Sequence, residues 1–324
     1  MTCSADLKVL FRAAAGPRRG FGHLVRCLSL ARAMNVRPLL SVRGGEAVTD
    51  AALALGGDVL ADSSVRVISK LRPDVVVVDD PIRTSARSWI RAARRAGAIV
   101  VTVHDLGIGC TDADLVIDGS VTRRARPKPG TVALTGTRFA ILDPRLPSTR
   151  RSAWTGRNRR VLVALGGGPR RAIALSVAEA IVASDPRAHV RVAGGFMAEP
   201  VRTSPRVTWI GAARGLREEL SRATVAVVGG GVSLYEAAAL GVPAIGVPVV
   251  RAQTPTVRAF EREGAAVAVP FRASEQQTAA TAVALLDDAR RRRQLAQRSQ
   301  QLVDGQGARR AAAAVLSFVE RKRS

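Results

Sequence analysis

The sequence predicts an α/β protein of two domains, each built on a parallel sheet. The length of 324 residues suits two domains of ordinary size. The apolar runs at 75–78 and 99–103 show no polar alternation, which is typical of strands buried on both faces of a parallel sheet. A succession of strand, glycine-containing loop and helix occurs in each half, and a stretch rich in Pro and Arg at 143–160 separates the halves.

The first domain is predicted to span residues 1–145 as alternating strands and helices. A helix at 23–33 carries Leu24, Leu28 and Ala31 on one face, because residues three or four positions apart share a helix face. A helix at 84–95 joins two buried strands, which makes a βαβ unit. The strands predicted in this domain lie at 9–11, 38–42, 75–78 and 99–103.

The second domain is predicted to span residues 158–324, after a linker that holds Pro144, Pro147 and Gly156. Glycine runs at 166–168 and 229–231 each follow a strand and open a helix. The strands are predicted at 161–165, 190–193, 225–228 and 244–247, the helices at 171–183 and 233–240, and a helical tail from residue 279.

The formal charge of +24 comes almost entirely from arginine, and it favours no nucleic-acid partner. The arginines are spread along the chain and are not interleaved with stacking aromatic side chains, which make up only 3% of the residues. A compositional bias of a GC-rich genome accounts for this pattern. A basic surface would still attract a sugar diphosphate or, weakly, an anionic membrane.

Compartment and cofactors are predicted from the cysteines and from the apolar runs. The three cysteines, Cys3, Cys27 and Cys110, are few and show no metal-ligand spacing, which fits a reducing cytoplasm and predicts no metal. No targeting segment is visible, and no apolar run reaches the roughly 18 residues that span a bilayer. We therefore expect a cytoplasmic protein without a bound cofactor.

The loop at 20–23 is the first candidate for chemistry. It joins the first strand to the first helix, and ligands of open α/β sheets bind beyond the carboxyl ends of the strands. Gly22 lets the backbone approach a ligand, and the imidazole of His23 could transfer a proton near neutral pH. A structural histidine in a tight turn is an equally good interpretation. The loop is not a dinucleotide fingerprint, because Val25 stands where the third glycine belongs.

The two glycine runs of the second domain predict a phosphate site. Free N–H groups at a helix N-terminus bind phosphate, and the helix dipole helps. Gly166, Gly167, Gly230 and Gly231 are the candidate residues, although glycines also occur there as ordinary turn residues. Neither run matches a P-loop, which needs a Gly-Lys-Ser/Thr sequence.

Ser233 and Glu236 follow the second glycine run and allow two interpretations. A carboxylate at Glu236 could accept both hydroxyls of a ribose. The three-residue spacing also fits a capping box, with Ser233 as the N-cap residue.

Other polar residues are weaker candidates for a functional site. Asp79 and Asp80 end a strand, where they could face a ligand or solvent. His104 and Asp105 could form an acid–base or metal pair, but no second cluster accompanies them. His189 opens a strand, and we expect it to be structural.

The segment from Gly20 to Ala31, GFGHLVRCLSLA, resembles the first loop and helix of the UDP-sugar hydrolases of pseudaminic acid biosynthesis, a family that includes spore-coat polysaccharide proteins. The segment from Gly229 to Gly241, GGGVSLYEAAALG, resembles the nucleotide site of that family. The C-terminal half also resembles the peptidoglycan N-acetylglucosaminyl transferase. Further similar segments lie in order at 75–80, 113–118, 139–144, 165–168 and 304–308, so that the resemblance covers nearly the whole chain.

This resemblance implies a GT-B fold, with two Rossmann-like domains facing across a cleft. It places UDP on the C-terminal domain, with the glycine loops at the diphosphate and Glu236 at the ribose. It makes His23 the base that activates water against the anomeric carbon, with no metal required. Arg12, Asp80 and Gln253 would face the sugar.

Three positions depart from the family pattern, because Ala14, Pro81 and Ala252 stand where polar or aromatic residues are usual. Lost hydrogen-bonding groups change which sugar fits a site. The sequence therefore predicts a nucleotide-sugar hydrolase, with a UDP-sugar as the expected substrate. A GT-B glycosyltransferase and a non-catalytic nucleotide-sugar-binding protein are the alternatives.

Overall fold

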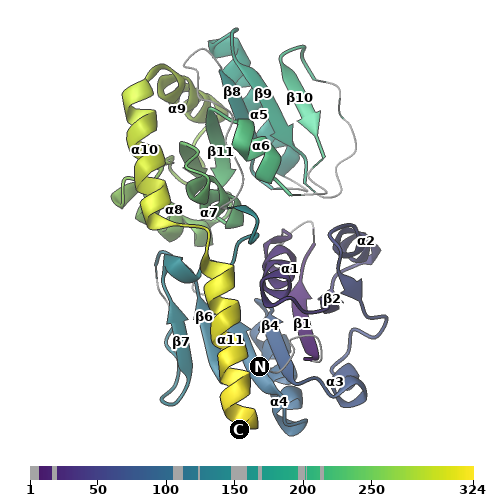
Figure 1. The fold of residues 1–324 in the computed structure, drawn as a ribbon. Helices are drawn as coiled ribbons and strands as arrows, with labels where there is room; N and C mark the ends of the chain where they lie inside the picture. Colours follow the sequence, from purple (N-terminus) through teal and green to yellow (C-terminus); the bar gives the residue numbers. More distant parts are fainter. Residues whose placement is uncertain are drawn as a thin grey trace. The chain divides into compact units, whose positions relative to one another are not determined.

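The computed structural model describes residues 7–16, 20–104, 112–122, 125–146, 159–166, 170–195, 201, 203–211 and 215–324. The chain divides into two compact units, shown in Figure 1. The first unit combines Met1–Pro144 with Gln306–Ser324, and the second is Arg145–Gly305. No helix among the described residues is long and apolar enough to cross a membrane.

The first unit is built on a seven-stranded sheet whose paired strands are all parallel. The order in the sheet is β3-β2-β1-β4-β5-β6-β7. The strands are β1 (Val9–Ala14), β2 (Leu39–Arg43), β3 (Asp58–Val59), β4 (Val75–Asp79), β5 (Ile99–Val103), β6 (Leu115–Asp118) and β7 (Val132–Thr135). The helices are α1 (Gly22–Met34), α2 (Glu46–Ala54), α3 (Arg66–Leu71), α4 (Arg83–Arg95) and α11 (Gly307–Arg323).

The central strands of this sheet bury both of their faces, as the continuous apolar runs predict. In β4 the residues Val75 and Val77 belong to one core, together with buried residues of α1 and α11. The alternate residues Val76 and Val78 belong to a second core, with residues of α3 and α4. The period of two along a strand thus assigns each β4 side chain to one face of the sheet.

The last helix, α11, belongs to the first unit, and this differs from the predicted second domain of residues 158–324. Ala308, Ala312 and Val315 are buried in the core that also contains residues of α1 and β1. At the start of the helix, Gly307 lies so close to Ala140 that a side-chain Cβ there would overlap its backbone. Figure 1 shows α11, in yellow, among the elements of the first unit.

The second unit is built on a six-stranded parallel sheet in the order β10-β9-β8-β11-β12-β13. The strands are β8 (Arg160–Ala164), β9 (His189–Ala193), β10 (Val207–Ile210), β11 (Val225–Gly229), β12 (Ala244–Val247) and β13 (Val267–Ala268). The helices are α5 (Arg170–Ser184), α6 (Arg217–Arg222), α7 (Val232–Ala239), α8 (Thr254–Arg262), α9 (Glu275–Asp287) and α10 (Ala289–Leu302).

Each sheet reverses its strand order at one place. In the first unit the reversal lies between β1 and β4, and in the second between β8 and β11. The connections that leave such neighbouring strands run to opposite faces of the sheet, and ligands of open α/β sheets bind beyond the carboxyl ends at this point. Most of the predicted site residues lie in these four strands, in the loops that follow them or in the helices that those loops open; Gln253, which follows β12, is the exception.

Candidate functional site

His23 and Asp79 meet at the strand-order reversal of the first unit. His23 lies in the first turn of α1, and Asp79 is the last residue of β4. The His23 Nδ1 atom is 2.7 Å from the Asp79 Oδ1 atom. Asp79 continues the β4 face of Val75 and Val77, which is the face that packs with α1. The strand period therefore directs its carboxylate towards the histidine.

Arg26 fixes the same carboxylate from one helical turn beyond His23. Its Nε atom donates to Asp79 Oδ2 at 2.9 Å, and its Nη2 atom donates to Asp79 Oδ1 at 2.9 Å. Asp79 is only 1% exposed, and burial by itself would raise its pKa. The charges of Arg26 and His23 outweigh that effect and lower the pKa of Asp79 to about 2, so the carboxylate is ionised at neutral pH.

The ionised carboxylate decides which nitrogen of His23 carries a proton. A carboxylate only accepts hydrogen bonds, so Nδ1 donates to Asp79 and Nε2 is left to accept a proton. The Arg26 Nη2 atom, which carries two hydrogens, also lies 2.8 Å from His23 Nδ1 while it donates to Asp79 Oδ1. The His23 side chain is 16% exposed, in contrast to the buried carboxylate. This arrangement is that of a general base oriented by an aspartate.

The depressed pKa of Asp79 predicts a stability loss in acid. Because the folded pKa is about 2 against an ordinary 3.8, this group stabilises the fold fully above pH 4, and the contribution is lost as the pH falls through 2. We expect Asp79→Asn to lower the free energy of unfolding at pH 7 by about 2 kcal/mol or more. Urea unfolding between pH 7 and pH 3 measures both effects.

The exposed Asp50→Asn variant is the control for this measurement, and it should match the native protein at every pH. In Asp79→Asn the fall in stability below pH 4 should be shallower than in the native protein. An acid profile with the native slope in Asp79→Asn would contradict the assignment.

Arg12 and Asp80, both predicted to face the sugar, lie together and are buried. The Arg12 Nη1 atom donates to Ser41 Oγ at 3.0 Å, its Nε atom is 3.5 Å from Asp80 Oδ2, and its guanidinium lies 4.8 Å above the Trp89 ring. Asp80 also accepts from the backbone N–H of Ile82 at 2.9 Å. These contacts give both residues partners inside the first unit, on the face of the sheet that packs with α4. Their contact with a sugar stays a prediction.

The glycine run of residues 229–231 opens α7 at the strand-order reversal of the second unit. Gly231, not Ser233, is the N-cap residue, and no side chain caps the helix. The capping box considered for Ser233 and Glu236 is therefore not formed. The structure shows a capping box elsewhere, between Ser274 and Gln277 at the start of α9. Glu236 is 8% exposed, one turn into α7.

Gln253 packs against this glycine run from the start of α8. A Cβ on Gly230 would lie 2.6 Å from Val257 Cγ2 and 3.0 Å from Gln253 Cβ, so only glycine fits there. The Gln253 Nε2 atom is 3.6 Å from the position that a Cβ on Gly231 would take. Its Oε1 atom accepts from the backbone N–H of Val249 at 3.0 Å. The structure thus brings Gln253 and the glycine run together.

The loop after β8 adjoins the loop after β11. The Leu165 carbonyl oxygen is 3.7 Å from the position of a Cβ on Gly229. Gly166 has a φ of 98°, a conformation that favours glycine, and Gly167 lies outside the described residues. The Arg170 Nη1 atom, at the start of α5, is 3.5 Å from the Cβ position of Gly166. Burial lowers the pKa of Arg170, whose cation stands beside the loop.

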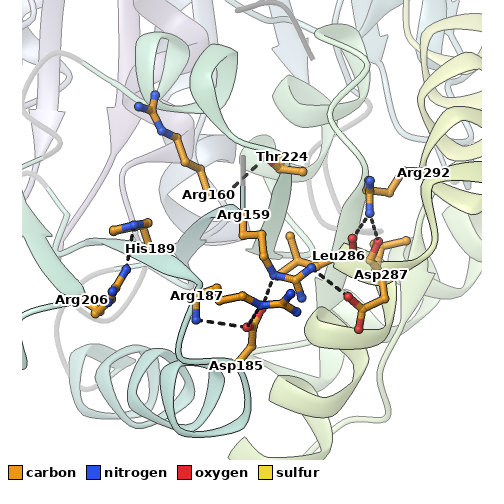
Figure 2. Close-up of polar contacts among 11 residues, drawn as sticks. Arg159, Arg160, Asp185, Arg187, His189, Arg206, Thr224, Leu286, Asp287 and Arg292 are labelled. Carbon is orange, nitrogen blue, oxygen red and sulfur yellow. Dashed lines mark hydrogen bonds and ion pairs between the residues drawn. The ribbon is translucent and has the colours of Figure 1, made fainter. Parts of the chain in front are cut away.

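The remaining histidines lie apart from these loops. His104 follows β5, where its Nδ1 atom is 3.6 Å from Asp118 Oδ2 at the end of β6, while Asp105 lies outside the described residues. His189 begins β9 at the amino edge of the second sheet, where its Nε2 atom accepts from Arg206 at 3.0 Å (Figure 2). Among the described residues, no three His, Cys, Asp or Glu side chains are grouped as metal ligands.

Two residues of the site, Arg26 and Arg170, were missed from the sequence, and the pairing of Asp79 with His23 was not predicted. Arg26 stands three positions after His23 in a predicted helix, which places both on one face. That spacing could have identified it. Arg170 carries no comparable signal, because arginines occur throughout the chain.

Comparisons with known proteins identify similar sequences and similar folds. Residues 202–300 match the family described as UDP-glucoronosyl and UDP-glucosyl transferase. The spore coat polysaccharide biosynthesis protein SpsG of Bacillus subtilis (strain 168) is 28% identical over 168 residues, which are 48% of this chain and 50% of that protein. The match thus spans half of the length of that relative.

Similar solved structures cover nearly the whole chain. The spinosyn rhamnosyltransferase SpnG complexed with thymidine diphosphate has a TM-score of 0.67 at 16% identity, over 97% of this chain and 100% of that one. A putative UDP-N-acetylglucosamine 2-epimerase from Listeria monocytogenes has a TM-score of 0.65 at 16% identity, over 98% of each chain. The fold is GT-B, with two Rossmann-like domains, as the sequence predicts.

Proposed function

We propose that the chain is a GT-B glycosyltransferase that takes its sugar from a UDP- or TDP-sugar donor. The observation that carries this proposal is the pair of adjoining glycine loops at the strand-order reversal of the second unit. The second loop and α7 lie within residues 202–300, the part similar to UDP-glucosyl transferases. A TDP-bound glycosyltransferase with the same fold supports the nucleotide diphosphate as donor.

In this proposal the second unit holds the nucleotide. The diphosphate lies against the glycine loops, where the backbone N–H groups and the dipole of α7 favour negative charge. Arg170 contributes a cation beside the first loop. The carboxylate of Glu236 accepts hydrogen bonds from the ribose hydroxyls, and Gln253 contacts the donor sugar beside Gly231.

The first unit supplies the base. His23 Nε2 takes the proton from an acceptor hydroxyl, whose oxygen then attacks the anomeric carbon of the donor sugar. The new bond to the acceptor forms as the bond from the sugar to the diphosphate breaks, and the nucleotide diphosphate leaves. The ionised Asp79 stabilises the imidazolium that results, while Arg26 keeps the carboxylate in place.

Hydrolysis is the second candidate, favoured by the resemblance of the segment from Gly20 to Ala31 to UDP-sugar hydrolases. The same base would then activate water instead of an acceptor hydroxyl. The amount of free sugar formed from a turned-over donor in the absence of any acceptor separates the two reactions. A transferase consumes little donor until an alcohol acceptor is added, whereas a hydrolase releases free sugar at full rate.

We expect UDP or TDP to raise the melting temperature more than ADP or GDP does. A ligand that binds only the native state stabilises it by mass action, by about 2.7 kcal/mol at one hundred times its dissociation constant. For a chain of this size such a gain corresponds to a shift of roughly 5 °C or more. Differential scanning fluorimetry with millimolar nucleotides measures the shift. Equal melting temperatures with and without every nucleotide would contradict the proposal.

A further inference from the structure

A cavity lies in the second unit, away from the glycine loops. Its volume is about 360 Å³, and its walls come from the first residues of β8 and β9, from β10 and from α6. Four of its lining residues are basic (Arg160, His189, Arg191 and Arg222) and one is acidic (Glu219). Arg160 is the first residue of β8, whereas Gly166 follows the end of that strand. The lining extends along β8 as far as Leu162, so at about 3.3 Å per residue roughly 13 Å of strand separates the cavity from Gly166.

The strand register places the basic residues on one face of the sheet. Arg160 pairs with His189, and one step further along the same face Leu162 pairs with Arg191. Arg191 in turn pairs with Thr208 of β10. Parallel sheets usually carry apolar side chains on both faces, because helices cover them. The face at this corner of the sheet instead presents charged groups to a cavity.

The carboxylates near the cavity are already paired. Glu219 accepts two hydrogen bonds from Arg191, with the Nη2–Oε1 distance at 2.8 Å. Arg159 pairs with both Asp185 and Asp287 on the other side of the strand, as Figure 2 shows.

Two of the guanidinium groups that line the cavity are left without a counter-ion. In Figure 2 the Arg160 side chain points away from the cluster around Arg159. Within the described part of the chain, the side chains of Arg160 and Arg222 make no ion pair or hydrogen bond. Arg160 and Arg222 are both exposed, so the cavity is open to solvent, and no described side chain neutralises its net positive charge.

We propose that this cavity binds a small metabolite through a phosphate or diphosphate group. The guanidinium fork matches phosphate oxygens in a bidentate manner, and two unpaired forks face one cavity. The volume is within the range of pockets that enclose small metabolites. Because the cavity is separate from the glycine loops, this anion would bind at the same time as a nucleotide.

Inorganic pyrophosphate tests the proposal by calorimetric titration, with and without saturating UDP. We expect the native protein to bind pyrophosphate in both conditions. The double variant R160Q/R222Q should lose affinity by roughly tenfold or more for each arginine removed. The control R290Q/R293Q removes the same charge from two arginines of α10 that are also exposed but do not line the cavity, and it should keep the native affinity. Circular dichroism establishes that each variant is folded.

The titrations of UDP and of pyrophosphate distinguish a failure of this proposal from a failure of the proposed function. If UDP did not bind, the proposed function would fail, while pyrophosphate binding that depends on Arg160 and Arg222 would still support the cavity. Native affinity in R160Q/R222Q would overturn the proposal. So would an equal loss in R290Q/R293Q, because general surface charge would then account for binding.

A variant that removes a negative charge from the cavity, and should therefore raise its affinity for anions, provides a second test. Glu219→Gln removes the one carboxylate among the lining residues and releases Arg191 from its pairing. We expect pyrophosphate to bind this variant more tightly than the native protein, by roughly tenfold. Unchanged or weaker binding by Glu219→Gln would contradict a site whose affinity comes from the charge in the cavity.

Discussion

His23→Ala should lower turnover of the nucleotide-sugar donor by roughly 10²–10⁴-fold, the usual contribution of a general base. Nucleotide affinity should remain close to native, because the proposed diphosphate and ribose contacts all belong to the second unit. Asp79→Asn should also lower turnover, because an amide no longer stabilises the imidazolium. Steady-state kinetics together with calorimetric titration of UDP measures the two effects separately.

His189→Ala is the matched control for His23→Ala. His189 is an exposed histidine that lines the separate cavity at the amino edge of the other sheet, away from the glycine loops, so its loss should leave donor turnover without added pyrophosphate unchanged. Native turnover in His23→Ala would mean that His23 only stabilises its loop. If nucleotide affinity fell together with turnover, His23 would belong to the diphosphate site and the proposed base would be wrong.

Glu236→Ala should weaken UDP binding by roughly 10²–10⁴-fold, because two hydrogen bonds to a charged acceptor, at about 1.5–3 kcal/mol each, are removed. This loss of affinity, measured by calorimetric titration, should exceed the loss of stability that thermal unfolding without nucleotide records. Glu236 is not part of a capping box, so its loss removes no helix cap.

Ser274→Ala is the matched control for Glu236→Ala, since Ser274 belongs to the capping box that the chain does form. This variant should lose about 1 kcal/mol of stability and keep the native affinity for UDP. Native affinity in Glu236→Ala would show that the ribose lies elsewhere.

The fold could be predicted from the sequence because the central strands are runs of four to six mostly apolar residues without polar alternation. Residues 99–103 and 244–247 were predicted with the bounds of β5 and β12. The strands β3 and β13 have only two residues each, and no periodicity is visible in so short a segment. The domain that receives α11 could not be predicted either, because an amphipathic pattern does not identify the surface it covers.

The positions of the site loops could be predicted from the sequence, but the side-chain contacts made in them, such as that of His23 with Asp79, could not. Consecutive residues of a strand point to opposite faces, so only one of Asp79 and Asp80 could reach His23. The choice depends on which face α1 covers, and that is a property of the packed domain. Ser233 suggested an N-cap because its spacing to Glu236 is correct, but the N-cap is Gly231 and the helix begins two residues earlier than that capping box requires.

The return of α11 to the first unit affects how the chain folds during synthesis. Residues 1–144 leave the ribosome early, but part of their core is supplied by Ala308, Ala312 and Val315, which are translated after the whole second unit. The usual order, in which the N-terminal domain folds first, is therefore incomplete here. The second unit can finish folding while the first still exposes the apolar groove that α11 fills. A fragment ending at residue 144 would keep that groove open permanently, and it would aggregate unless the residues 306–324 were supplied with it.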